Sequence, residues 1–139
     1  MRRLLLFTAL TAISTPLAAQ SAAFEAARGA SLTPGQWTYA RTADGSEARF
    51  GMQFSVKCNA ASRQVILRRL DVATAQPLTI TTDLQSRLIP VSGVLGSADR
   101  VLDAIAFSRG RFLVGGEGAP RLVLPAASEA ARSIEDCRI

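Results

Sequence analysis

Residues 47–58 read Glu-Ala-Arg-Phe-Gly-Met-Gln-Phe-Ser-Val-Lys-Cys, and every second position of this stretch is apolar. The apolar positions are Ala48, Phe50, Met52, Phe54, Val56 and Cys58. A period of two is typical of a β-strand with one face in the core and the other in water. The stretch therefore predicts one long half-buried strand that ends with Cys58 on its buried face.

Shorter stretches on both sides show the same alternation. Trp37 and Tyr39 flank Thr38, and residues 43–46 have the composition of a turn, so a hairpin with the long strand is expected. Further strands are expected at 63–70, 78–84, 87–91, 111–114 and 121–124. Pro90 restricts the strand at 87–91 to a sheet edge, because proline cannot donate a ladder hydrogen bond. The glycine-rich residues 115–120 predict the turn of a hairpin between the last two strands.

Two segments have a helical period instead. Apolar residues recur at i, i+3, i+4, i+7 and i+8 from Ala98 to Ala106, which predicts a short helix near 98–108 with Ser97 at its N-cap. A second helix is expected from Ser128 to Cys137, with a narrow apolar stripe. The expected fold class is α+β. It combines an antiparallel sheet of about six or seven strands, curved or arranged as a sandwich or partial barrel, with a C-terminal helix.

The chain has two cysteines, Cys58 and Cys137. In an oxidising compartment an even number of cysteines most simply forms a disulfide, and the alternative is two buried free thiols. Closing a loop of about 80 residues would stabilise the fold by at most about 4 to 5 kcal/mol on the chain-entropy model. The bond would hold the C-terminal helix, whose apolar stripe is narrow, against the inner face of the long strand.

The N-terminal residues have the three parts of an export signal in order. Arg2 and Arg3 precede an apolar stretch at 4–13, and small residues follow at 16–23. We expect residues 1–19 to be removed by cleavage after Ala19, or alternatively after Ala23. Residues 20–34 are expected to form a flexible lead-in or a short frayed helix before a single domain at 35–139. No apolar stretch reaches the roughly 20 residues of a membrane-spanning helix, so a periplasmic or secreted protein is expected.

The formal net charge of +5 falls to +3 when Arg2 and Arg3 are removed, because 14 basic residues then face 11 acidic ones. This excess is mild, and nucleic-acid binding is not expected. One hypothesis joins basic residues from two regions into an anion-binding surface, if the fold brings them together: Arg63, Arg68, Arg69, Arg109 and Arg111. Its ligand would be an envelope protein with an acidic surface or an anionic envelope polymer. The alternative is that each arginine is solvated or paired locally.

The sequence contains few of the residue combinations that indicate catalysis or metal binding. The chain contains no histidine, which excludes Ser-His-Asp and Cys-His nucleophile systems and histidine-ligated metals. Asp99 and Asp103 lie one helical turn apart, but Arg100 between them favours a solvated helix face over a cation site. The glycines at 115–118 lack the lysine of a phosphate-binding loop. The sequence therefore predicts no enzyme, no cofactor and no metal.

Five features together resemble a known group of proteins: Trp37 near the domain start, the strand ending at Cys58, FSRGRFLV at 107–114, RLVLP at 121–125, and EDCR at 135–138. They are similar to small uncharacterised exported proteins of alphaproteobacteria, and more loosely to the periplasmic invasion-associated locus B type. The resemblance spans most of residues 37–138. It implies a compact β-rich periplasmic module and assigns no functional residue.

We expect a binding or accessory module of the cell envelope. The alternative is a small β-rich inhibitor of an exported enzyme such as a protease, which should present a fixed, protruding segment at 20–33 or at the glycine loop. An enzyme ranks third.

Overall fold

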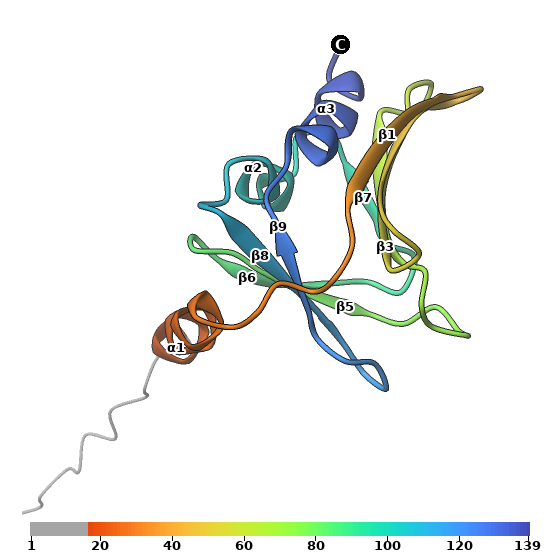
Figure 1. Cartoon of the computed structure of the whole chain (residues 1–139). Helices are drawn as coiled ribbons and strands as arrows, with labels where there is room; N and C mark the ends of the chain where they lie inside the picture. Colours follow the sequence, from red (N-terminus) through yellow and green to blue (C-terminus); the bar gives the residue numbers. More distant parts are fainter. Residues whose placement is uncertain (1–16) are drawn as a thin grey trace, which may run out of the picture.

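A computed structural model describes residues 17–139, so most of the expected signal segment lies outside the described residues. Within this range the chain forms two antiparallel sheets and three helices (Figure 1). The five-stranded sheet has the order β1 (Trp37–Thr42), β2 (Gly45–Phe50), β3 (Phe54–Asn59), β4 (Gln64–Arg69) and β7 (Val94–Gly96). The four-stranded sheet has the order β6 (Ser86–Ile89), β5 (Leu78–Thr81), β8 (Arg111–Gly116) and β9 (Leu122–Pro125). The helices are α1 (Leu17–Arg28), α2 (Arg100–Ala106) and α3 (Ser128–Asp136). The expected α+β class with antiparallel strands and a C-terminal helix is confirmed.

The single long strand predicted at 47–58 is wrong, because the chain turns back at its middle. Phe50 and Phe54 are paired in register across the β2–β3 hairpin, and Gly51 makes the turn with a φ of 52°. Met52, predicted on the buried face, lies at the tip and is 72% exposed. The hairpin loop has three residues, so Phe50 and Phe54 keep the same parity and both point into the core. The alternation of apolar residues therefore continues through the turn, so the sequence pattern does not reveal that the chain turns here.

Inward-facing side chains of both sheets, α2 and α3 form one core. The partly buried Trp37 packs against this core, with its ring centroid 5.5 Å from that of Phe50 and 6.3 Å from that of Phe112 in the other sheet. The indole Nε1 of Trp37 donates to the carbonyl of Pro125 at 2.9 Å. Figure 1 shows α3 beside the curved five-stranded sheet and α2 next to α3, close to the four-stranded sheet. Trp37 therefore joins the two sheets by packing and by a hydrogen bond.

The segment expected as a lead-in or frayed helix is helical up to Arg28. Helix α1 lies on the outer face of the four-stranded sheet, where Ala27 joins Leu113 and Val123 in a small second cluster. Arg111 donates to the carbonyls of Ala27 at 3.2 Å and Ala30 at 2.6 Å, which satisfies the C-terminal end of the helix.

Two other elements differ from expectation. Helix α2 is capped by Asp99 rather than Ser97, because the Asp99 carboxylate accepts from the Val101 amide at 3.0 Å. Strand β7 was not predicted. It follows Gly93, whose φ is 67° and whose missing Cβ would lie 2.1 Å from the Leu67 carbonyl oxygen. Only glycine allows the chain to approach β4 this closely.

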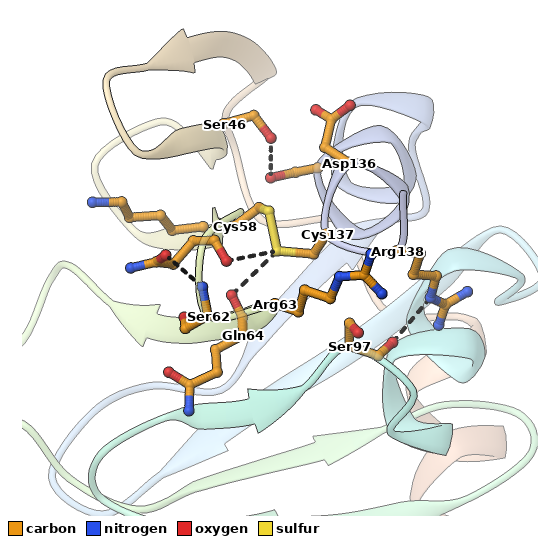
Figure 2. Close-up of a disulfide and its surroundings, with 12 residues drawn as sticks. Ser46, Cys58, Ser62, Arg63, Gln64, Ser97, Asp136, Cys137 and Arg138 are labelled. Carbon is orange, nitrogen blue, oxygen red and sulfur yellow. Dashed lines mark hydrogen bonds between the residues drawn. A yellow bond between two sulfur atoms is a disulfide. The ribbon is translucent and has the colours of Figure 1, made fainter.

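Helix α3 is fixed to the five-stranded sheet by a disulfide between Cys58 and Cys137, whose Cα atoms are 5.5 Å apart (Figure 2). This confirms the predicted pairing. The hydroxyl of Ser133 donates to the Val56 carbonyl at 3.0 Å, and Tyr39 donates to the Asp136 carboxylate at 2.5 Å. Between residues 17 and 139, no helix is long and apolar enough to cross a membrane.

Candidate functional site

The five arginines proposed as one anion-binding surface do not converge. Arg69 is buried, and it forms a bidentate ion pair with Asp71. Its Nε donates to Oδ1 at 2.7 Å and its Nη2 donates to Oδ2 at 2.6 Å. It also donates to the Pro120 carbonyl at 2.9 Å. The hydrogen bonds from Arg69 lower the pKa of Asp71 below its usual value. Arg69 therefore stabilises the fold and has no free face for a ligand.

The other four arginines lie in separate places. Arg63 is in the β3–β4 turn and donates to the Ile139 carbonyl at 3.3 Å. Arg68 points outward from β4, whereas Arg111 binds the end of α1. Arg109 is 88% exposed in the turn before β8, with Asp83 3.9 Å away. The convergence that the anion-surface hypothesis required is not present.

Asp99 and Asp103, considered as a carboxylate pair, are each paired with a different arginine. Asp99 caps α2 and is ion-paired with Arg87, and Asp103 is ion-paired with Arg138 at 2.8 Å. Across the described part of the chain, no group of three or more His, Cys, Asp or Glu side chains could hold a metal.

The free edge of β6 is the first part of a different candidate site. Strand β6 is the edge of the four-stranded sheet, consistent with the position of Pro90 just beyond it. The Thr82 amide donates to the Gln85 carbonyl at 2.8 Å, which makes Thr82–Gln85 the hydrogen-bonded pair that closes the β5–β6 hairpin. Hydrogen-bonded and non-bonded pairs alternate in an antiparallel ladder, so Arg87 and Ile89 are bonded to β5. The main-chain N–H and C=O groups of Ser86 and Leu88 consequently point to the open edge.

One face of α2 and the β5–β6 turn enclose an apolar hollow beside this edge. Its volume is about 380 Å³. The residues from α2 and just beyond its end are at i, i+3, i+4 and i+7, and those from the turn are adjacent: Arg100, Asp103, Ala104, Phe107, Leu84 and Gln85. Phe107 is 71% exposed and Leu84 is 72% exposed, whereas Ala104 is buried. We call this the α2 hollow.

A second hollow of about 410 Å³ lies on the opposite face of the same sheet. It is lined by Pro77, Thr79, Leu88, Gly116 and Glu117, and Leu88 of β6 is 67% exposed there. Helix α1 packs on Leu113 and Val123 of this outer face, whereas Leu88 remains exposed. We call this the outer hollow. The outer hollow thus borders β6 itself, and the α2 hollow lies on the side of α2, at the β5–β6 turn that leads into this strand.

The other sheet edges in residues 17–139 lack this combination. The β9 edge is bonded to Thr33, whose amide donates to the Val123 carbonyl at 2.9 Å. Strand β7 has three residues, and the Ser97 carbonyl next to it accepts from Arg138 at 2.9 Å. Strand β1 carries the exposed, charged Arg41, a feature that discourages edge pairing.

Sequence reasoning missed both hollows. The strand expected at 78–84 includes Leu84, but β5 ends at Thr81, and the tight turn places Leu84 at the surface. Phe107 falls inside the predicted helix and is the C-cap of α2. It lines the hollow with Arg100 and Asp103, away from the buried stripe of Val101, Leu102 and Ile105. An aromatic residue on the polar face of an amphipathic helix is the signal that could have indicated this surface.

Comparison with known proteins gives no match to the chain among protein-family models, curated proteins or solved structures. The candidate site is therefore defined by its geometry alone.

Proposed function

We propose that the protein is an exported binding module that holds an extended segment of another envelope protein along the free edge of β6. The single observation behind this proposal is an open strand edge with an apolar hollow on each face of the sheet. A peptide strand added to such an edge gains main-chain hydrogen bonds, and its alternate side chains point to opposite faces. The two hollows would receive these side chains.

The exposed apolar side chains support this use of the surface. Eight large apolar side chains are exposed in the described residues, and four of them are close to β6 in sequence or line the α2 hollow: Leu84, Leu88, Val91 and Phe107. Leu84 and Phe107 line one hollow together, and exposed apolar side chains gathered in this way are typical of an interaction surface. Natural proteins usually protect open edges with charges, but the one charge on β6, Arg87, is ion-paired with Asp99 at the start of α2. The combination favours a bound strand as the function of this edge.

A periplasmic or secreted location is part of the proposal. The disulfide between Cys58 and Cys137 supports it, because structural disulfides persist in oxidising compartments. The signal pattern at the start of the chain points the same way. A partner in the cell envelope follows from this location.

The test is a selection of random linear peptides displayed on phage against the oxidised protein, followed by affinity measurement with two variants at one position. Leu88→Pro removes the free-edge N–H without removing a bond to β5, whereas Leu88→Val keeps that N–H and an apolar side chain. We expect Leu88→Pro to weaken binding about tenfold or more and Leu88→Val to change it little, since a lost hydrogen bond with an unpaired partner costs about 1 to 3 kcal/mol. Equal affinity of the two variants, with matching circular dichroism spectra, contradicts strand addition at β6.

An inhibitor of an exported enzyme is the second candidate. The β8–β9 turn carries the exposed Glu117 and Gly118, and the buried Arg69 fixes the turn through the Pro120 carbonyl. Inhibitors bind proteases through such protruding, rigid segments. Inhibition of an exported protease that is lost in Glu117→Lys but kept in Leu88→Pro would favour this candidate over peptide binding at β6.

A further inference from the structure

We infer that the segment held along β6 is acidic, with an Asp or Glu side chain that contacts Arg100 and a bulky apolar side chain that fills the α2 hollow. This inference rests on the proposed function and specifies the partner. It commits to an extended peptide segment of another protein as the occupant of the hollow.

The charges around the α2 hollow carry the inference. Two acidic groups near it are already matched within the protein, because Asp103 is paired with Arg138 and Asp99 with Arg87. Arg100, which lines the hollow, is exposed and forms no ion pair among residues 17–139. Of the two charged groups that line the hollow, Arg100 is therefore the one without an ion partner in the described residues. An acidic side chain of a partner would complement it.

The distance between Arg100 and Phe107 determines the spacing of acidic and apolar residues that we expect in the partner segment. Arg100 and Phe107 are seven residues apart on one helix face, or about 10 Å at 1.5 Å per residue. Side chains on the same face of an extended strand repeat about every 7 Å. An acidic residue two or four positions from the apolar residue can then contact Arg100 while the apolar side chain lies between Leu84 and Phe107. Glu117 lines the outer hollow on the opposite face of the sheet and would repel an acidic side chain there. We therefore expect the acidic side chain of the peptide on the face toward α2.

A charge reversal tests the inference. Random displayed peptides are selected at low salt on the oxidised wild-type protein, on Arg100→Glu and on Arg68→Glu. Arg68 is a matched control, since it is exposed and lies on the outward face of the five-stranded sheet. Glutamate in the first turn of α2 also suits the helix dipole, so Arg100→Glu should fold normally.

We expect wild type and Arg68→Glu to enrich peptides with Asp or Glu two or four residues from a bulky apolar residue, and Arg100→Glu to enrich Lys or Arg there. An acidic peptide should lose about fivefold in affinity for Arg100→Glu, and less at high salt. The inference is overturned if the enriched peptides show no preference for acidic residues, or if Arg100→Glu enriches the same acidic peptides as wild type. Either result leaves the proposal of peptide binding in place. Failure to enrich any peptide that needs the Leu88 amide overturns the proposed function as well.

Discussion

Arg87, in the middle of β6, is ion-paired with Asp99, the residue that caps α2. One carboxylate thus accepts from the first turn of the helix and from the side chain of the edge strand. The two walls of the α2 hollow are joined at this point. We therefore expect the shape of the α2 hollow to depend on this ion pair, although neither Arg87 nor Asp99 lines the hollow.

Asp99→Ala is expected to lower the free energy of unfolding by about 1 to 2 kcal/mol, because it removes both the cap and the ion pair. Asp99→Ser keeps a capping oxygen and should recover most of this loss, which urea unfolding measures. Peptide affinity should fall in both variants, since both separate α2 from β6. Full binding by Asp99→Ser would show that the link to Arg87 does not shape the hollow.

Replacing both cysteines with alanine is expected to destabilise the fold by about 2 to 4 kcal/mol. Cys58 and Cys137 are both buried, and they hold the C-terminal end of α3 on β3. Urea unfolding of the oxidised protein and of the double variant measures the difference. The α3 amides should also lose more protection from hydrogen exchange than the β8 amides. A uniform loss over both elements would contradict a local role for the bond.

Asp71→Ala is expected to cost about 3 kcal/mol or more, because it leaves the guanidinium of Arg69 buried without its counter-charge. The double variant Arg69→Met/Asp71→Ala should be more stable than Asp71→Ala alone, since no unpaired charge then remains in the core. Chemical denaturation of the three proteins tests this. A double variant no more stable than Asp71→Ala would assign the effect to lost packing.

Acid is expected to destabilise the protein below about pH 4. Hydrogen bonds from Arg69 lower the folded-state pKa of Asp71. Burial would raise the pKa of Asp136, but hydrogen bonds from Tyr39 and Ser46 outweigh it and lower this pKa too. A lowered folded pKa stabilises the protein above the unfolded value of about 3.9, and this contribution disappears as the pH falls through the folded pKa. The chain has no histidine, so little change is expected between pH 5 and 8.

Unfolding free energies from pH 7 to pH 2 test this dependence. Asp136→Asn should be less stable than wild type at pH 7, and the difference should shrink below pH 4. A difference that stays constant down to pH 2 would contradict it.

Local patterns in the sequence predict most of the fold, because alternation and helical period record which side chains face the core. They predict the β-rich class, the C-terminal helix and the pairing of Cys58 with Cys137. They fail where a turn leaves the pattern unchanged, as at Gly51, whose three-residue loop keeps Phe50 and Phe54 in phase. They also miss β7, which depends on the close approach of Gly93 to Leu67 rather than on a pattern of its own.

The candidate site was less predictable than the fold. Arg111 could not be distinguished from a surface arginine by sequence, because its partner, the Ala30 carbonyl, is far away along the chain. The main partner of Arg69, Asp71, is only two residues away, but the burial of Arg69 depends on the tertiary structure. The α2 hollow lies between α2 and the β5–β6 turn, and the outer hollow lies over β5, β6 and the end of β8. Only the tertiary arrangement brings Leu84 and Phe107 together.

Residue-resolved amide hydrogen exchange of β6, with and without a selected peptide, tests the central claim most directly. The account predicts that the free-edge amides of Ser86 and Leu88 exchange rapidly in the unbound protein and slow markedly when the peptide binds. The amides of Arg87 and Ile89, already bonded to β5, should be protected in both states. Peptide binding that leaves Ser86 and Leu88 unprotected would contradict strand addition at this edge.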